Sequence, residues 1–106
     1  MKIAYLQFQP ELLNPEANIK KVTELTGNIT ENIDLLVMPE LTNSGYLFTS
    51  IDEARSASEE IPDGKFCQTL QQIAFAKNMY IVSGICESAG DKLYNSAVLI
   101  SPNVEF

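Results

Sequence analysis

The segment Asp34-Leu35-Leu36-Val37-Met38-Pro39-Glu40 decides the class of fold that this sequence predicts. Its four consecutive apolar residues do not alternate with polar ones, which is typical of a strand covered on both faces of a sheet. Pro39 ends the strand, because proline lacks the amide hydrogen that a further hydrogen bond between strands would need. We therefore expect an α/β domain with the strand Leu35–Met38 inside its sheet.

Signals on both sides of this strand predict the other elements. Asn14-Pro15-Glu16 combines a helix N-cap, a first-turn proline and a first-turn acid, so a helix should begin there. The order of elements favours a mostly parallel sheet with an antiparallel pair at the end. The two long helices should pack on one face and leave the other to a second sheet or a partner. The expected strands are Ile3–Phe8, Leu35–Met38, Tyr80–Ile85 and Leu93–Ile100. The expected helices cover residues 15–30 and 65–77, with a short one at Ile51–Ser58. Between the last two strands, Glu87–Lys92 should form a hairpin loop.

Length and charge narrow the classes of function. The chain has 106 residues, which fits one domain. Fourteen acidic residues against seven basic ones give a formal net charge of −7, which disfavours nucleic acid and anionic membranes as partners. There is no histidine, so no Ser–His pair, Cys–His pair or imidazole metal site can form within the sequence. With no phosphate-binding glycine loop and no metal-ligand spacing, we expect neither cofactor nor metal.

Cysteine usage and the N-terminal segment favour the cytoplasm. Cys67 and Cys86 are too few for the disulfide framework of a small secreted domain. Gln7 and Gln9 interrupt any apolar signal-peptide core, and no apolar run approaches the length of a membrane span. We therefore expect a protein of the reducing cytoplasm.

Glu40 is the side chain best placed for chemistry. It follows a buried strand, and reacting groups in open α/β sheets gather at the carboxyl ends of the strands. A carboxylate beside a hydrophobic strand end is partly desolvated, which suits it to proton transfer. Gly45-Tyr46 brings a flexible turn and an aromatic ring to the same edge. The structural alternative is a solvated acid where a strand meets water.

Four other side chains have structural explanations. Cys86 lies at the end of a strand, where a cysteine near a base is a possible nucleophile. Free cysteines are, however, among the most buried residue types, and no histidine or cluster of bases is available to lower the pKa, so we expect Cys86 and Cys67 to fill the core. Glu87 opens a polar loop and should be solvated, with a second acid of the site as the alternative. Asn95 lies in an apolar strand and needs hydrogen-bond partners if buried, so it is either a structural bridge or a pocket-lining residue.

Taken together, these segments resemble the N-terminal part of the nitrilase-like carbon–nitrogen hydrolase superfamily. The resemblance covers essentially the whole chain. Its most specific pieces are Leu36-Val37-Met38-Pro39-Glu40-Leu41 with Gly45-Tyr46, and Leu93-Tyr94-Asn95-Ser96-Ala97-Val98 at this separation. Weaker matches in the same order are Gln7-Phe8-Gln9-Pro10, Ile61-Pro62-Asp63-Gly64 before a helix, and Tyr80-Ile81-Val82-Ser83-Gly84.

The resemblance implies an α-β-β-α sandwich that hydrolyses small amides, carbamoyl groups or nitriles through a Glu–Lys–Cys triad. Glu40 falls on the general base, and Tyr46 becomes the candidate for substrate binding. In such a triad the glutamate takes the thiol proton, the thiolate attacks the substrate carbon and the lysine stabilises the oxyanion. The family's lysine and cysteine would come after Phe106. We therefore expect residues 1–106 to form a single incomplete domain, inactive alone and homo-oligomeric when full length.

A second function stays open at this point. The chain would then be a non-catalytic α/β interaction module that associates through its uncovered sheet face. A coding sequence that continues to a lysine and then to a cysteine in a strand-to-helix turn favours the enzyme. A stop codon favours the module.

Overall fold

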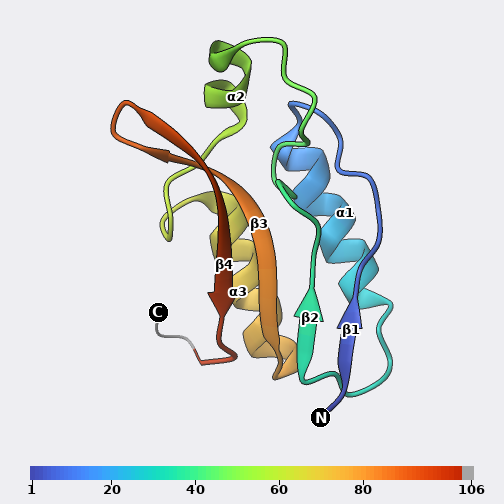
Figure 1. Ribbon diagram of the computed structural model, residues 1–106. Coiled ribbons are helices and arrows are strands. Elements are labelled where there is room, and N and C mark those ends of the chain that lie inside the picture. The colour runs from blue at the N-terminus through green and yellow to red at the C-terminus, as the bar shows by residue number, and fades with distance from the viewer. Residues whose placement is uncertain (104–106) are drawn as a thin grey trace.

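The computed structural model describes residues 1–103 and contains one four-stranded sheet with helices on one of its faces (Figure 1). Its elements are β1 (Ile3–Tyr5), α1 (Pro15–Gly27), β2 (Leu35–Val37), α2 (Ile51–Ala57), α3 (Lys65–Lys77), β3 (Tyr80–Ala89) and β4 (Lys92–Ile100). The strands lie in the order β1-β2-β3-β4, with β1, β2 and β3 parallel and β4 antiparallel to β3. The predicted α/β class, the parallel pairing and the antiparallel final pair are confirmed.

Capping groups explain where α1 begins and where both long helices end. Asn14 Oδ1 accepts a hydrogen bond from the Ala17 amide at 3.1 Å, directly before the proline of the first helical turn. α1 ends at Gly27, earlier than predicted, because the Asn28 amide already donates to carbonyls of the last turn. α3 ends where Asn78 takes the left-handed conformation, with a φ of 52°. Each helix therefore begins or ends at a signal that the sequence carries.

The core lies between the sheet and the two long helices, which sit behind the sheet in Figure 1. Leu36 of β2 and Ile81 and Ile85 of β3 are fully buried there, as are Val22 of α1 and Phe66 of α3. Burial of each such side chain stabilises the fold by about 1.5–3 kcal/mol. Because Leu36 and Ile81 are register partners, the core also fixes the pairing of β2 with β3.

The parallel strands are shorter than the sequence predicts. β1 ends at Tyr5 rather than at Phe8, and β2 ends at Val37 rather than at Met38. The chain beyond β2 still follows β3, since the Met38 amide donates to the Val82 carbonyl at 2.8 Å. The regular strand β2 therefore ends early, while backbone hydrogen bonds to β3 continue beyond it toward Glu40.

The final hairpin is longer than predicted, and the expected loop Glu87–Lys92 is wrong. β3 runs to Ala89 and β4 starts at Lys92, so a two-residue turn joins them. Gly90 has a φ of 63° in this turn, a conformation that favours glycine. The polar ends of the strands pair with each other instead of forming a loop: Ser96 Oγ donates to Glu87 Oε1 at 2.6 Å.

The sheet face opposite the helices is apolar and open within residues 1–103. Ile3 and Tyr5 of β1, Tyr80 of β3 and Leu99 of β4 are 60%, 71%, 46% and 65% exposed. The strand register places Ile3 in line with Tyr80, and Tyr5 in line with Leu99, so their side chains share one face. The prediction that the helices leave one face uncovered is confirmed.

Candidate functional site

Hydrogen bonds to β3 hold the segment that carries Glu40. The Gly84 amide donates to the Pro39 carbonyl at 3.1 Å, and the Thr42 amide donates to the Gly84 carbonyl at 3.1 Å. These two bonds flank Glu40 on either side. The structure therefore places Glu40 at the carboxyl end of β2, alongside the middle of β3.

Gly84 allows this close approach because it has no side chain. A Cβ atom at this position would lie 2.5 Å from the Cα of Glu40 and 2.6 Å from the amide nitrogen of Leu41. Both contacts are with backbone, which cannot rotate away as a side chain can. Sequence reasoning missed this contact, although a glycine inside a strand is a general signal of close backbone approach.

The carboxylate of Glu40 accepts a hydrogen bond from the other edge of the hairpin. Asn95 Nδ2 lies 2.5 Å from Glu40 Oε1, although the two residues are 55 positions apart in the sequence. Asn95 is the register partner of Cys86 on β3, so β3 separates the two segments that bear the pair. Asn95 is exposed, so the burial that would have required partners is not observed, and of the two roles that the sequence allowed it takes the bridging one.

Glu40 and Tyr46 line one hollow at this end of the sheet. Its volume is about 460 Å³, and its other lining residues are Gln7, Phe8, Gln9, Pro10 and Pro39. The two residues that the sequence singled out are therefore brought together, along the path that the chain takes after β1.

The hollow is open to water in the part of the chain that the structure describes. Both Glu40 and Tyr46 are exposed, Tyr46 by 57%. The expected partial desolvation of Glu40 is therefore not observed within residues 1–103, because no element of this range covers the carboxylate from outside. In its solvation Glu40 therefore matches the structural alternative, although it is hydrogen-bonded to Asn95 and lines the hollow.

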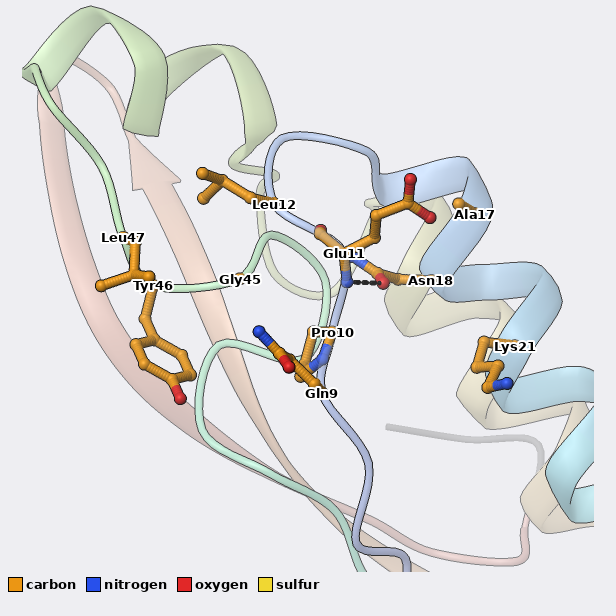
Figure 2. A pocket seen from close by; sticks show the side chains of 10 residues that line it. All are labelled: Gln9, Pro10, Glu11, Leu12, Ala17, Asn18, Lys21, Gly45, Tyr46 and Leu47. Atoms are coloured by element: carbon orange, nitrogen blue, oxygen red, sulfur yellow. Dashed lines mark hydrogen bonds between the residues drawn. The ribbon is translucent and has the colours of Figure 1, made fainter.

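A second hollow adjoins the first and shares Gln9, Pro10 and Tyr46 with it (Figure 2). Its volume is about 410 Å³, and it lies between the segment 45–47 and the start of α1. Lys21 contributes a cation to its lining and Glu11 a carboxylate. Tyr46 thus lines both hollows, the first with the Glu40 carboxylate and the second with one acidic and one basic side chain.

Buried amide side chains anchor the loop that follows Glu40. Asn43 Oδ1 accepts a hydrogen bond from the Cys86 amide at 2.8 Å, and its Nδ2 donates to the Cys86 carbonyl at 3.2 Å. Asn18 of α1 donates to the Asn43 carbonyl at 3.0 Å and binds both backbone groups of Glu11, as part of Figure 2 shows. This chain of amides joins α1, the loop and β3, and so fixes the surroundings of Glu40.

Sequence reasoning also missed Asn18 and Asn43. A signal for Asn18 existed, because it lies four residues before Val22 and eight before Thr26, on the face of α1 that is buried. A polar residue on such a face needs partners. Nothing comparable marks Asn43, which lies in an irregular loop.

Neither cysteine is suited to act as a nucleophile. Burial, with the Glu59 carboxylate nearby, raises the pKa of the Cys67 thiol to about 12. Burial also raises the pKa of the Cys86 thiol, against a smaller opposite effect of a hydrogen bond with Ser44. Both thiols stay protonated near neutral pH, as expected for residues that fill the core. Glu87, predicted to be solvated, is instead half-buried and bonded to Ser96.

Metal-binding clusters and membrane-spanning helices are both absent from the described residues. Residues 1–103 contain no group of three or more histidine, cysteine, aspartate or glutamate side chains arranged to hold a metal ion. Over the same range, no helix has the length and apolar character needed to cross a membrane.

A mostly parallel sheet with a carboxylate at the end of an inner strand defines an α/β protein with a polar site at the carboxyl edge of its sheet. Comparison with known proteins identifies the family within this class. Residues 2–106 match the carbon-nitrogen hydrolase family, and the chain belongs to this family.

The similar curated proteins include nitrilases and amidases. A "Nitrilase" of Pyrococcus abyssi is 37% identical over 103 residues, covering 96% of this chain and 39% of that protein. A "2-oxoglutaramate amidase" of Bacillus subtilis is 32% identical over 96 residues, covering 89% of this chain and 35% of the relative. The chain therefore spans about two fifths or less of the length of these relatives.

Solved structures show the same fold. The crystal structure of an N-terminal amidase with a Gln-Val peptide superposes with a TM-score of 0.88 at 22% identity, over 96% of this chain and 25% of that chain. A CN-hydrolase superfamily protein from Xanthomonas campestris gives a TM-score of 0.79 at 18% identity, over 92% and 35%. At these identities the likeness concerns the fold alone.

Proposed function

We propose that this chain supplies the general base of an enzyme that hydrolyses non-peptide C–N bonds in small amides or nitriles, with Glu40 as that base. The observation that carries the proposal is the placement of Glu40. Its backbone is held against β3, its carboxylate accepts one hydrogen bond, and it lines a hollow of about 460 Å³. A general base needs a fixed position with an oxygen open to the proton that it takes.

The proposed chemistry follows from the Glu–Lys–Cys triad of the family. Glu40 takes the proton of a cysteine thiol, and the thiolate attacks the carbon of the amide or nitrile. A lysine stabilises the oxyanion that forms from an amide carbonyl. With an amide, the protonated Glu40 returns the proton to the nitrogen as the C–N bond breaks, and the thioester that remains is hydrolysed by water. With a nitrile, the returned proton goes to the nitrogen of a thioimidate, one water converts this to the thioester with release of ammonia, and a second water hydrolyses the thioester. Tyr46 would form part of the wall against which the substrate lies.

We place the cysteine and the lysine of this triad in a longer protein of which the chain is the N-terminal part. Cys67 and Cys86 are buried and protonated, so they do not suit the role of nucleophile. The hollow around Glu40 is lined by seven residues, none of them a lysine or arginine. The share of the relatives' length that the chain covers supports this placement. The remainder of the longer protein would also cover the exposed carboxylate of Glu40 and remove it from bulk water.

The open sheet face supports the same proposal. In the α-β-β-α sandwich that the resemblance implies, a second sheet would cover Ile3, Tyr5, Tyr80 and Leu99. The same exposed side chains favour the second candidate, a non-catalytic module that associates through this face. The two candidates differ in what they require of Glu40, since only the enzyme needs its carboxylate.

Substitution of Glu40 by glutamine in the longer protein tests the proposal. Turnover should fall by about three orders of magnitude or more, because an amide cannot accept the thiol proton. Ammonia release would be measured with 2-oxoglutaramate, Asn-Glu and Gln-Val peptides and an aliphatic nitrile, because the similar proteins include a 2-oxoglutaramate amidase, N-terminal amidases with these peptides and a nitrilase. Glu24→Gln is the matched control, because Glu24 is exposed on α1. A Glu40→Gln variant that turns over substrate like the control, at equal melting temperature, overturns the proposal.

A further inference from the structure

We propose that Asn95 is a positioning residue for Glu40: its amide holds one carboxylate oxygen and leaves the other to take the thiol proton. The inference rests on the proposed function, because it assigns Asn95 a task only if Glu40 is the general base. The hydrogen bond from Asn95 holds the side chain of Glu40, in addition to the two backbone hydrogen bonds that hold the chain on either side of it.

The geometry of the pair suits this task. Asn95 Nδ2 donates to Glu40 Oε1 at 2.5 Å, and among residues 1–103 no other donor to this carboxylate is found. A hydrogen bond to an ionised acceptor is about twice as strong as one between neutral groups. With Oε1 held in this way, rotation of the carboxylate is restricted and Oε2 keeps a constant direction.

The support behind Asn95 is rigid. Its register partner across the hairpin is Cys86, and both backbone groups of Cys86 are bound by the buried side chain of Asn43. Asn43 is fully buried and is itself bound by Asn18 of α1. Movement of Asn95 relative to Glu40 would therefore have to disturb a buried network, not only one surface contact.

Asparagine also has the right chemistry for the position. Its amide donates a hydrogen bond to a carboxylate without carrying a proton that it could exchange with the reacting groups. A lysine here would neutralise the base, and an aspartate would add a second negative charge beside it. Asn95 is exposed and packs into no core, so the hydrogen bond is the main property that a substitution removes.

Few other charged or titratable groups face Glu40 in the described residues. Tyr46 is the second titratable side chain that lines the hollow, and Cys86 lies opposite Asn95 on β3. Glu87 is bonded to Ser96, whose register partner is Ile85, so it faces the other side of the hairpin. A negative charge placed at position 95 would therefore act mainly on Glu40.

The test uses Asn95→Ala and Asn95→Asp in the longer protein, assayed with whichever of the four amides and nitriles is turned over fastest. For Asn95→Ala we expect kcat to fall about tenfold to a hundredfold with KM nearly unchanged, because the base is no longer held in line. For Asn95→Asp we expect the acidic limb of the kcat/KM profile to move up by about one pH unit, because two neighbouring carboxylates resist ionising together. This limb reports that the two side chains are close, whereas the fall in kcat at nearly unchanged KM reports that Glu40 is held in position. A merely structural role for Asn95 would lower the melting temperature without this separate loss of kcat in the folded variant.

Asn103→Asp is the matched control, because it makes the same chemical change at an exposed position away from Glu40. If both Asn95 variants match this control in kcat and pH profile while Glu40→Gln is inactive, the positioning role is wrong and the general base stands. If Glu40→Gln is active, both proposals fail. If Asn95→Ala does not fold, kcat and KM of Asn95→Asp decide the matter when they are measured above its acidic limb, because aspartate keeps the shape of asparagine but lacks its amide donor.

Discussion

Replacing Gly84 by alanine tests how closely the backbone of Glu40 must approach β3. The φ of Gly84 lies outside the left-handed region, so its backbone accepts an alanine, and only the space around the new methyl group is at issue. That methyl carbon would start 2.5 Å from the Cα of Glu40, whereas ordinary contacts begin at about 3.4 Å. The two backbones must therefore separate by almost an ångström.

Two effects of known size follow from this separation. Overpacking of a well-packed region lowers the free energy of unfolding by about 1–3 kcal/mol. Misplacement of a reacting group by about 1 Å reduces the rate by about a hundredfold. We therefore expect Gly84→Ala to lower kcat far more than the modest loss of stability would suggest, because the contact lies directly behind Glu40.

The assay compares two alanine variants of the longer protein. Gly27 ends α1, and a methyl group added to it would meet no atom within 4 Å, so Gly27→Ala introduces the same group without a clash. The free energy of unfolding would be measured with urea, and kcat by ammonia release under conditions where both variants are folded. Equal stability and equal kcat for Gly84→Ala and Gly27→Ala would refute the reasoning.

Two further predictions concern buried groups around the site. Asn43→Ala should lower the free energy of unfolding by about 1–3 kcal/mol, measured by urea denaturation, because it leaves the buried amide of Cys86 without its acceptor. An unchanged unfolding midpoint would contradict this. Burial raises the pKa of the Cys67 thiol from its ordinary value of 9.0 to about 12. The contribution of the protonated thiol to the free energy of unfolding is therefore complete below pH 9, and it is lost as the pH rises toward 12. Urea denaturation between pH 8 and 11 should show this loss in the parent protein, and a Cys67→Ala variant with the same slope would exclude the thiol as its cause.

The sheet and helices could be predicted because their signals are local. The apolar run Leu35–Met38, the cap at Asn14 and the stop at Asn78 each act within a few residues, and the structure has an element boundary near each of them. The prediction for Glu87–Lys92 was wrong for the same reason. Gly90 and the polar residues around it looked like a loop, while their cross-strand partners lie outside any local window.

The surroundings of Glu40 could not be predicted from local patterns. Its position at a strand end is a local property, and the structure agrees on that placement. Its contacts with Gly84 and Asn95 join residues from three neighbouring parts of the sheet, and their distances depend on register and twist. No single segment of the sequence contains that information. The resemblance to a family suggested a role for Glu40, but it said nothing of what holds it.

The separation of 55 residues between Glu40 and Asn95 has a consequence for how the protein is made. Synthesis proceeds from the N-terminus, so Glu40 is translated well before its donor. The bond can form only after β4 has docked as the edge strand beside β3, and contacts between distant segments are the slow ones in folding. A nascent chain that already has β1, α1 and β2 therefore carries the carboxylate without its anchor. The final geometry at Glu40 is reached late, when the hairpin closes.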